Sequence, residues 1–65
     1  MTIKQKQHLL AYLGYYSGAI DGSYGPQTQA ATEAFQRGYS LTADGRFGPD
    51  TEKRILEVIA TGGPA

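Results

Sequence analysis

The chain contains one short stretch twice. "IDGSYGPQT" at residues 20–28 returns as "ADGRFGPDT" at residues 43–51, an offset of 23 residues in a chain of 65. At this offset other residues also pair: Ala11 with Ala34, Tyr12 with Phe35, Tyr16 with Tyr39, and Ser17 with Ser40. A chain of this length holds a single domain near the lower size limit for independent folding. We therefore expect one small domain built from two related units.

Each copy of the repeat predicts a turn followed by the start of a helix. Gly22 and Gly45 each follow an aspartate and suit a turn that needs positive φ. A Gly-Pro pair comes next in both copies. Proline is favoured at the first helical position because its missing N–H would have no partner there. We therefore expect Gly25 and Gly48 to be helix N-caps.

Apolar and small residues recur at helical spacing in three segments. The first, with Ile3, Leu10 and Leu13, predicts a helix over about residues 2–13, ended by Gly14. The other two segments follow the two prolines and contain Thr28, Ala31, Ala34 and Phe35, and Thr51, Ile55, Val58 and Ile59. The predicted fold is therefore all-α, a compact three-helix bundle with two repeated Gly/Pro-rich loops.

The composition excludes several classes of function. Six basic and six acidic residues give zero net charge, which disfavours nucleic-acid and membrane binding and argues against a helix-turn-helix protein. With no cysteine and one histidine, we expect no disulfide, metal or cofactor. His8 has no serine or carboxylate in a telling arrangement, and Asp21 and Asp44 each have a turn to form. The chain is therefore not expected to be an enzyme.

The two ends of the sequence give further expectations. The first residues contain lysines but no apolar stretch long enough for a signal peptide or a membrane span. At the other end, "TGGPA" contains two glycines and a proline after the last periodic apolar residue. We therefore expect a domain over residues 1–60, and in residues 61–65 the start of a flexible linker or tail.

Residues 7–56 resemble the small three-helix peptidoglycan-binding domain of cell-wall hydrolases and phage endolysins. The resemblance is carried by several features in order: Gln7 with Leu10, "LGYYSG" at 13–18, "IDGSYGPQT", "AFQ" at 34–36, and "LTADGRFGPDT" at 41–51. One departure is Ser40, which precedes Leu41 where the family usually has glycine. This departure concerns the turn after the second helix.

The resemblance implies a non-catalytic module that holds an attached hydrolase on bacterial peptidoglycan. It implies peptidoglycan as the partner, through its glycan or its stem peptide, and a monomer linked to a catalytic domain. Without a signal peptide, the parent protein is expected to be an endolysin that stays cytoplasmic until its release to the cell wall. The alternative is a protein-interaction module without affinity for the wall.

Ligand-binding candidates come from outside the repeated turns, whose residues are expected to shape turns and start helices. Tyr24 and Phe47 occupy equivalent positions, and we expect both rings in the core and no need for the Tyr24 oxygen. A bundle this small hides few rings, so at least one of the other tyrosines is expected at the surface, where its ring would face sugar or peptide groups. For Tyr15, Tyr16 and Tyr39, packing in the core is an equal alternative. The predicted site residues are Tyr15, Tyr16, Gln36, Arg37 and Tyr39. For Gln36, a hydrogen bond to neighbouring backbone is an equal alternative.

Overall fold

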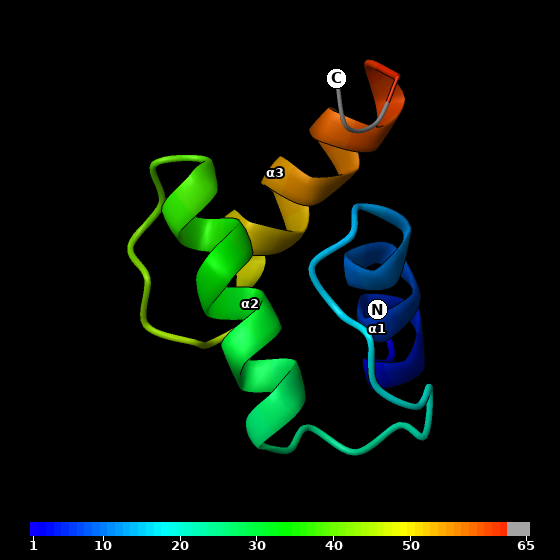
Figure 1. The fold of residues 1–65 in the computed structure, drawn as a ribbon. Coiled ribbons are helices and arrows are strands. Elements are labelled where there is room, and N and C mark those ends of the chain that lie inside the picture. The colour runs from blue at the N-terminus through cyan, green and yellow to red at the C-terminus, as the bar shows by residue number, and fades with distance from the viewer. Residues whose placement is uncertain (63–65) are drawn as a thin grey trace.

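The computed structural model describes residues 1–62 and contains three helices, α1 (Ile3–Tyr12), α2 (Pro26–Gly38) and α3 (Pro49–Ala60) (Figure 1). Those residues contain no strand, which confirms the all-α class. A first loop joins α1 to the start of α2, and a second loop runs along the outside of α2 to α3 (Figure 1). Of the expected linker, Thr61 and Gly62 form the turn that closes α3, and residues 63–65 lie outside the described residues.

The helix starts agree with their local sequence signals. Thr2 caps α1 in a capping box, because its hydroxyl accepts from the Gln5 backbone N–H and the Gln5 side chain accepts from the Thr2 N–H. Gly25 and Gly48 are the N-caps of α2 and α3, each followed by a proline. Their backbone is extended, with φ of −98° and −91°, so neither cap needs the left-handed region.

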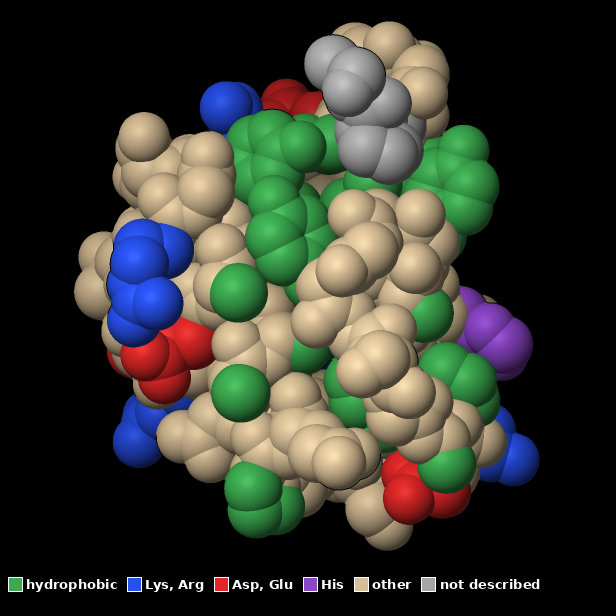
Figure 2. Space-filling model, in the orientation of Figure 1, with side chains coloured by type: hydrophobic (Ala, Val, Ile, Leu, Met, Phe, Trp, Pro, Cys, Tyr) green, Lys and Arg blue, Asp and Glu red, His purple; other side chains and the backbone are tan. Residues whose placement is uncertain are grey.

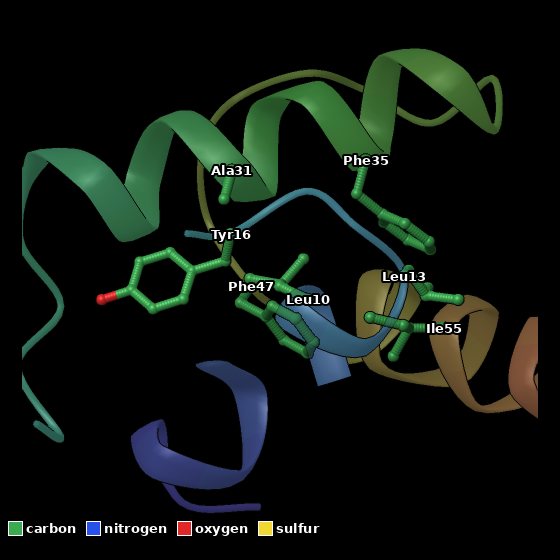
Figure 3. Close-up of a cluster of buried hydrophobic side chains, with 7 residues drawn as sticks. All are labelled: Leu10, Leu13, Tyr16, Ala31, Phe35, Phe47 and Ile55. Atoms are coloured by element: carbon green, nitrogen blue, oxygen red, sulfur yellow. The ribbon is translucent and has the colours of Figure 1, made fainter. Parts of the chain in front are cut away.

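One apolar cluster holds the three helices and both loops together (Figure 3). It consists of Leu10, Leu13, Tyr16, Ala31, Phe35, Phe47 and Ile55. Phe35 of α2 is fully buried, as are Leu10 of α1 and Ile55 of α3. Each helix therefore contributes at least one fully buried side chain. None of the helices within residues 1–62 is long and apolar enough to span a membrane.

A buried glutamine side chain organises the first loop. Gln7 of α1 is fully buried, and its Oε1 accepts the Gly22 N–H at 3.0 Å. Its Nε2 lies 3.1 Å from Asp21 Oδ1, 3.0 Å from the Ser23 carbonyl oxygen and 3.1 Å from Thr28 Oγ1. One amide therefore contacts backbone and side-chain groups across the turn and in the first turn of α2.

A second glutamine makes the same set of contacts in the second loop. Gln36 of α2 accepts the Gly45 N–H at 3.0 Å. Its Nε2 lies 3.1 Å from Asp44 Oδ1, 2.8 Å from the Arg46 carbonyl oxygen and 2.9 Å from Thr51 Oγ1. We call each of these arrangements an amide clamp. Gly22 and Gly45 have φ of 78° and 74° at the centre of the two turns, as the sequence predicts.

Both aspartates of the clamps are held in the ionised form. The Ser23 N–H and then the Gln7 amide donate to Asp21, and these hydrogen bonds lower the pKa of its carboxyl. The pKa of Asp44 is lowered in the same way, first by the Arg46 N–H and then by the Gln36 amide. The two turns therefore match in electrostatics as well as in geometry.

The loops are also tied to distant parts of the chain. The Tyr24 hydroxyl of the first loop donates to the Gly45 carbonyl of the second loop at 2.7 Å, and it lies 2.8 Å from the Thr32 hydroxyl. The expectation that the Tyr24 oxygen is not needed is therefore wrong, although its ring does pack against the core. Burial of this hydroxyl raises its pKa.

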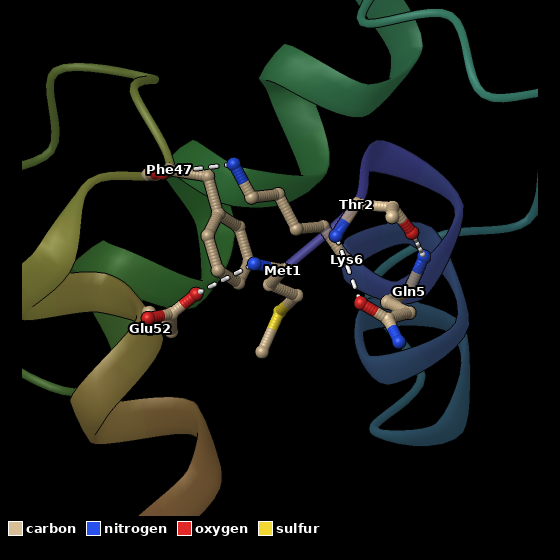
Figure 4. A network of polar contacts seen from close by, with 6 residues as sticks. All are labelled: Met1, Thr2, Gln5, Lys6, Phe47 and Glu52. Atoms are coloured by element: carbon tan, nitrogen blue, oxygen red, sulfur yellow. Dashed lines mark hydrogen bonds and ion pairs between the residues drawn. The ribbon is translucent and has the colours of Figure 1, made fainter.

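Contacts at the start of α1 attach that helix to the second loop and α3 (Figure 4). Lys6 Nζ donates to the Phe47 carbonyl at 3.3 Å and lies 5.2 Å from the centre of the Phe47 ring. The Met1 amino group lies 3.7 Å from a Glu52 carboxylate oxygen. These contacts join segments more than 40 residues apart in sequence.

The 23-residue offset fails in the helix that precedes each loop. It pairs Tyr12 with Phe35, but Tyr12 is 63% exposed and Phe35 is fully buried. The clamp glutamines, Gln7 and Gln36, are instead 29 residues apart, because the first clamp spans six more residues between glutamine and aspartate than the second. The sequence repeat therefore corresponds to a repeated structure in the turns and in the helix starts that follow them.

Ser40 has a left-handed backbone, with φ of 60°. Its place after α2 corresponds to the place of Gly14 after α1, and Gly14 also has positive φ, 89°. Both helices close with the same type of backbone hydrogen bond, Tyr15 N–H to Leu10 carbonyl and Leu41 N–H to Gln36 carbonyl. The serine that departs from the family pattern therefore keeps the turn, but with the steric cost of a side chain at positive φ.

The first prediction compares two glycines of the second loop. Gly45→Ser should lower the free energy of unfolding by about 1 to 3 kcal/mol, because the residue has positive φ. The new Cβ would also lie 2.8 Å from Gln29 Cγ. Gly48→Ser should leave stability unchanged or raise it slightly, because that backbone is extended and the added Cβ meets nothing within 4 Å. Equal urea midpoints for the two variants would contradict this geometry.

The second prediction concerns the strained serine. Ser40→Gly should raise the free energy of unfolding by about 0.5 to 1 kcal/mol, because glycine removes the left-handed strain. The greater conformational freedom of glycine in the unfolded chain offsets part of this gain. Ser17→Gly is the control, since Ser17 is exposed and does not have positive φ. It should be slightly destabilising. A lower melting temperature for Ser40→Gly would show that the strain is absent.

The third prediction is a pH dependence. Because the folded-state pKa values of Asp21 and Asp44 lie below the ordinary 3.8, their contribution is fully present above that value and is lost as the pH falls through the folded values. Urea midpoints between about pH 6 and pH 2.5 measure this loss. The double variant Asp21→Asn, Asp44→Asn should show a flatter profile than the parent. An unchanged profile would show that other carboxyls cause the acid sensitivity.

Candidate functional site

The largest of the described hollows lies between the C-terminal end of α2 and the N-terminal end of α3. It has a volume of about 410 Å³, and we call it the second-loop hollow. Its lining includes Ser40, Leu41, Asp44, Arg46, Pro49 and Asp50. Arg46 brings a guanidinium group and the two aspartates bring carboxylates, all on exposed residues. The hollow can therefore receive a ligand that carries both signs of charge.

Two smaller hollows adjoin at the first loop. One, of about 270 Å³, is lined by Tyr15–Gly18 together with Gln27, Ala30 and Ala31. The other, of about 200 Å³, includes Asp21, Ser23 and Pro26. Tyr16 and Gln27 line both, so the two hollows are neighbours, and we call them together the first-loop groove. It offers an aromatic ring, alanines, hydroxyls and an amide.

The structure brings Tyr15 and Tyr16 together in the first-loop groove. Tyr15 is half-buried and packs edge-on against Phe35, with ring centres 5.7 Å apart. Tyr16 is only 8% exposed, and its hydroxyl donates to the Ala19 carbonyl. The expectation of an exposed contact ring therefore does not hold for Tyr16, which is a core residue with one edge on the groove.

Gln36 borders the second-loop hollow but has no polar group left for a ligand. It is 1% exposed, and its amide oxygen and nitrogen are both engaged in the amide clamp. The alternative expected from the sequence, hydrogen bonds to nearby backbone, therefore describes this residue. Gln36 therefore shapes the hollow through its hydrogen bonds to Asp44 and Arg46.

Arg37 and Tyr39 line neither depression. Arg37 is exposed on α2 and forms an ion pair with Glu33 at 2.7 Å, one turn earlier on the same helix. Tyr39 packs on Phe35 with ring centres 4.8 Å apart, and the Arg54 guanidinium lies 5.8 Å from its ring centre. The equivalence of Tyr16 and Tyr39 that the offset suggests is therefore wrong, because the two rings have different neighbours.

Three residues of the depressions were missed from the sequence: Gln27, Arg46 and Asp50. All three are exposed and lie within the repeated stretch, whose residues were assigned to turns as a group. A signal was present, because the turn and cap positions are the same in both copies whereas these side chains differ. Position 23 is serine where position 46 is arginine, and position 27 is glutamine where position 50 is aspartate.

The surface charges are dispersed. On the face in Figure 2, basic and acidic side chains lie in small groups near the edges, some of them side by side, with no broad region of one sign of charge. Across residues 1–62, no three His, Cys, Asp or Glu side chains are grouped so that they could hold a metal ion. The second-loop hollow and the first-loop groove lie beside the repeated loops, and a further hollow of about 330 Å³ is lined by Met1, Gln5, His8, Leu9 and Leu56.

Comparison with known proteins relates the chain to enzymes of the cell wall. It is 49% identical over 49 residues to the N-acetylmuramoyl-L-alanine amidase CwlM of Mycobacterium tuberculosis, covering 75% of this chain and 12% of that protein. It is 50% identical over 40 residues to the zinc D-Ala-D-Ala carboxypeptidase of Streptomyces albus G, covering 62% of this chain and 16% of that protein. No solved structure matches the chain significantly.

A further relative has a different description. The putative OxPP cycle protein OpcA of Synechocystis is 40% identical over 55 residues, covering 85% of this chain and 12% of that protein. The chain thus corresponds to less than a fifth of the length of each of these relatives. The shared segment is a module that occurs in proteins of different overall function.

The family described as putative peptidoglycan binding domain matches residues 2–55, which include all of α1 and α2, both loops and the first half of α3. This match confirms the resemblance carried by the repeated turns, and with it a binding role rather than a catalytic one. The chain is a member of the peptidoglycan-binding domain family.

Proposed function

We propose that this domain anchors a cell-wall hydrolase on peptidoglycan and that the second-loop hollow binds the stem peptide. The observation that carries the site is the charge pattern of the hollow: one guanidinium and two carboxylates beside a volume of about 410 Å³. Stem peptides carry free carboxylates and amino groups, so both signs of charge find a partner. A guanidinium can also bind a carboxylate through two parallel hydrogen bonds.

The side chains that would contact the peptide are supported by a rigid frame. Arg46 follows the left-handed Gly45 directly, and its backbone N–H and carbonyl are bonded to Asp44 and Gln36. Asp50 lies in the first turn of α3, whose start is fixed by Gly48 and Pro49. The backbone on both sides of the hollow is therefore held before the ligand arrives, which lowers the entropic cost of binding.

The wider context of the module is part of the same proposal. Amidase and carboxypeptidase relatives support an attached catalytic domain that cuts the wall to which this module binds. We propose that the module acts as a monomer within such an enzyme. An endolysin that stays in the cytoplasm until lysis is the parent protein expected from the sequence.

The relationship to OpcA favours a second candidate, a protein-interaction module without affinity for the wall. OpcA is named for the OxPP cycle and not for a wall enzyme. The two candidates differ in one measurable respect, because only the first requires binding to peptidoglycan that is free of protein.

The fourth prediction tests the proposed function. The domain should co-sediment with purified, protein-free peptidoglycan and bind soluble stem peptide, and Arg46→Ala should weaken both by about tenfold, the effect of losing one charge-assisted hydrogen bond. Truncation keeps the Arg46 backbone, so the amide clamp should persist. Arg37→Ala is the matched control, since Arg37 is an exposed arginine that does not line the hollow.

Two outcomes would contradict the proposal. Absence of co-sedimentation at high protein concentration would favour the protein-interaction candidate. Equal loss of stem-peptide binding in Arg37→Ala and Arg46→Ala would show that general positive charge, and not the hollow, holds the peptide.

A further inference from the structure

The two amide clamps place one backbone arrangement at two points on the surface. In each, an aspartate and a glycine of positive φ precede an extended glycine and a proline that begins a helix. The side chains that line both depressions therefore correspond in pairs at the 23-residue offset: Asp21 with Asp44, Ser23 with Arg46, and Gln27 with Asp50. Within these loops and helix starts, residues 23 positions apart therefore occupy equivalent places in the structure.

Two of these three pairs differ in charge. Ser23 and Gln27 are neutral, whereas Arg46 and Asp50 are charged. Asp21 is the sole charged residue in the lining of the first-loop groove, and hydrogen bonds from the Ser23 N–H and the Gln7 amide already occupy one of its carboxylate oxygens. The same scaffold thus gives a depression with one guanidinium and two carboxylates at one point, and a depression with a single carboxylate at the other.

The first-loop groove also contains aromatic rings and alanines, which the lining of the second-loop hollow lacks. It continues along Tyr15–Gly18 to Ala30 and Ala31 of α2. Figure 3 shows the Tyr16 ring at the margin of the core cluster, with its hydroxyl directed away from the other core side chains. The Gln7 amide at 3.4 Å and the Ala19 carbonyl hold that hydroxyl in place. The groove therefore presents a fixed aromatic edge beside small apolar side chains.

Gln27 completes the groove on its other side. Gln27 is exposed and lies in the first turn of α2. Its side-chain amide lies against Gly18, because a Cβ added to Gly18 would be 2.4 Å from Gln27 Oε1. An amide can donate and accept hydrogen bonds at once, which is what an acetamido group requires. An aromatic edge, small apolar groups and a neutral amide together match a sugar ring that carries an N-acetyl group.

We propose that the first-loop groove is a second subsite, which binds an uncharged N-acetylated sugar of the glycan strand. This proposal rests on the proposed function, in which the second-loop hollow binds the stem peptide. The groove borders the first turn of α2 at Gln27, and the hollow borders its last turn at Gln36. These two residues are nine positions apart, which at 1.5 Å per residue is about 14 Å along the helix axis. Weak binding at two linked points gives a higher combined affinity than either alone.

The test uses two probes and two matched variants. The isotope-labelled domain is titrated separately with a soluble N-acetylglucosamine oligomer and with free stem peptide, while backbone amide shifts are followed. The sugar should shift the amides of residues 15–18, Gln27 and Ala30, and Gln27→Ala should weaken its binding by about tenfold. Stem-peptide binding should be unchanged in this variant. Asp50→Ala, at the corresponding position of the other loop, should have the opposite selectivity.

A second pair of variants separates contact from shape. Gln27→Asp gives the first-loop groove the residue of the second loop and should also abolish the sugar-induced shifts at residues 15–18. Asp50→Gln should leave those shifts intact. Both positions are exposed in a first helical turn, so thermal unfolding is expected to confirm that the variants stay folded.

The outcomes distinguish this proposal from the proposed function. Sugar-induced shifts confined to the second loop, or undiminished sugar binding by Gln27→Ala, would overturn the subsite. If the stem peptide fails to bind while the sugar still shifts residues 15–18, the subsite stands and the assignment of the second-loop hollow is wrong. Binding of neither probe by a domain that still sediments with peptidoglycan would overturn both assignments.

Discussion

The structure depends on two buried glutamine amides. Loops without regular structure leave backbone groups that need partners inside the protein, since a buried donor or acceptor without one costs about 1 to 3 kcal/mol. Gln7 and Gln36 supply both kinds of partner, because an amide donates through its nitrogen and accepts through its oxygen. No buried side-chain nitrogen or oxygen within the described residues lacks a hydrogen bond. A glutamate in either place would lose the donors and would also repel the neighbouring aspartate.

The amide clamps also explain how so short a chain holds its loops without disulfides. Each clamp joins the helix before a loop to the loop itself and to the start of the next helix. Tyr24 then links the first loop to the second through the Gly45 carbonyl, and Gly45 is itself held by Gln36. The two loops are therefore coupled, and a change that disturbs one clamp is expected to affect the geometry of the other.

The sequence was sufficient for the helices and turns because their signals are local. Gly-Pro pairs, a capping threonine and apolar periodicity each act within a few residues, and the observed ends of α1, Ile3 and Tyr12, agree with the expected helix over residues 2–13. The sequence does not predict the clamps, although it allows Gln36 to bond to neighbouring backbone. Their partners lie 8 to 21 residues from the glutamines, and a polar residue on a core-facing helical position does not reveal which loop it will meet.

The repeated stretch contains two kinds of residue, those that the fold uses and those that line the surface depressions. Its invariant features, the aspartate, the two glycines, the proline and the threonine, are all used by the fold, and this accounts for the repetition. Four of its variable side chains, at positions 23, 27, 46 and 50, are exposed and line the depressions. Because the clamps fix the backbone in both copies, these four positions can differ without loss of structure. A duplicated turn can in this way present two different ligand chemistries from one small core.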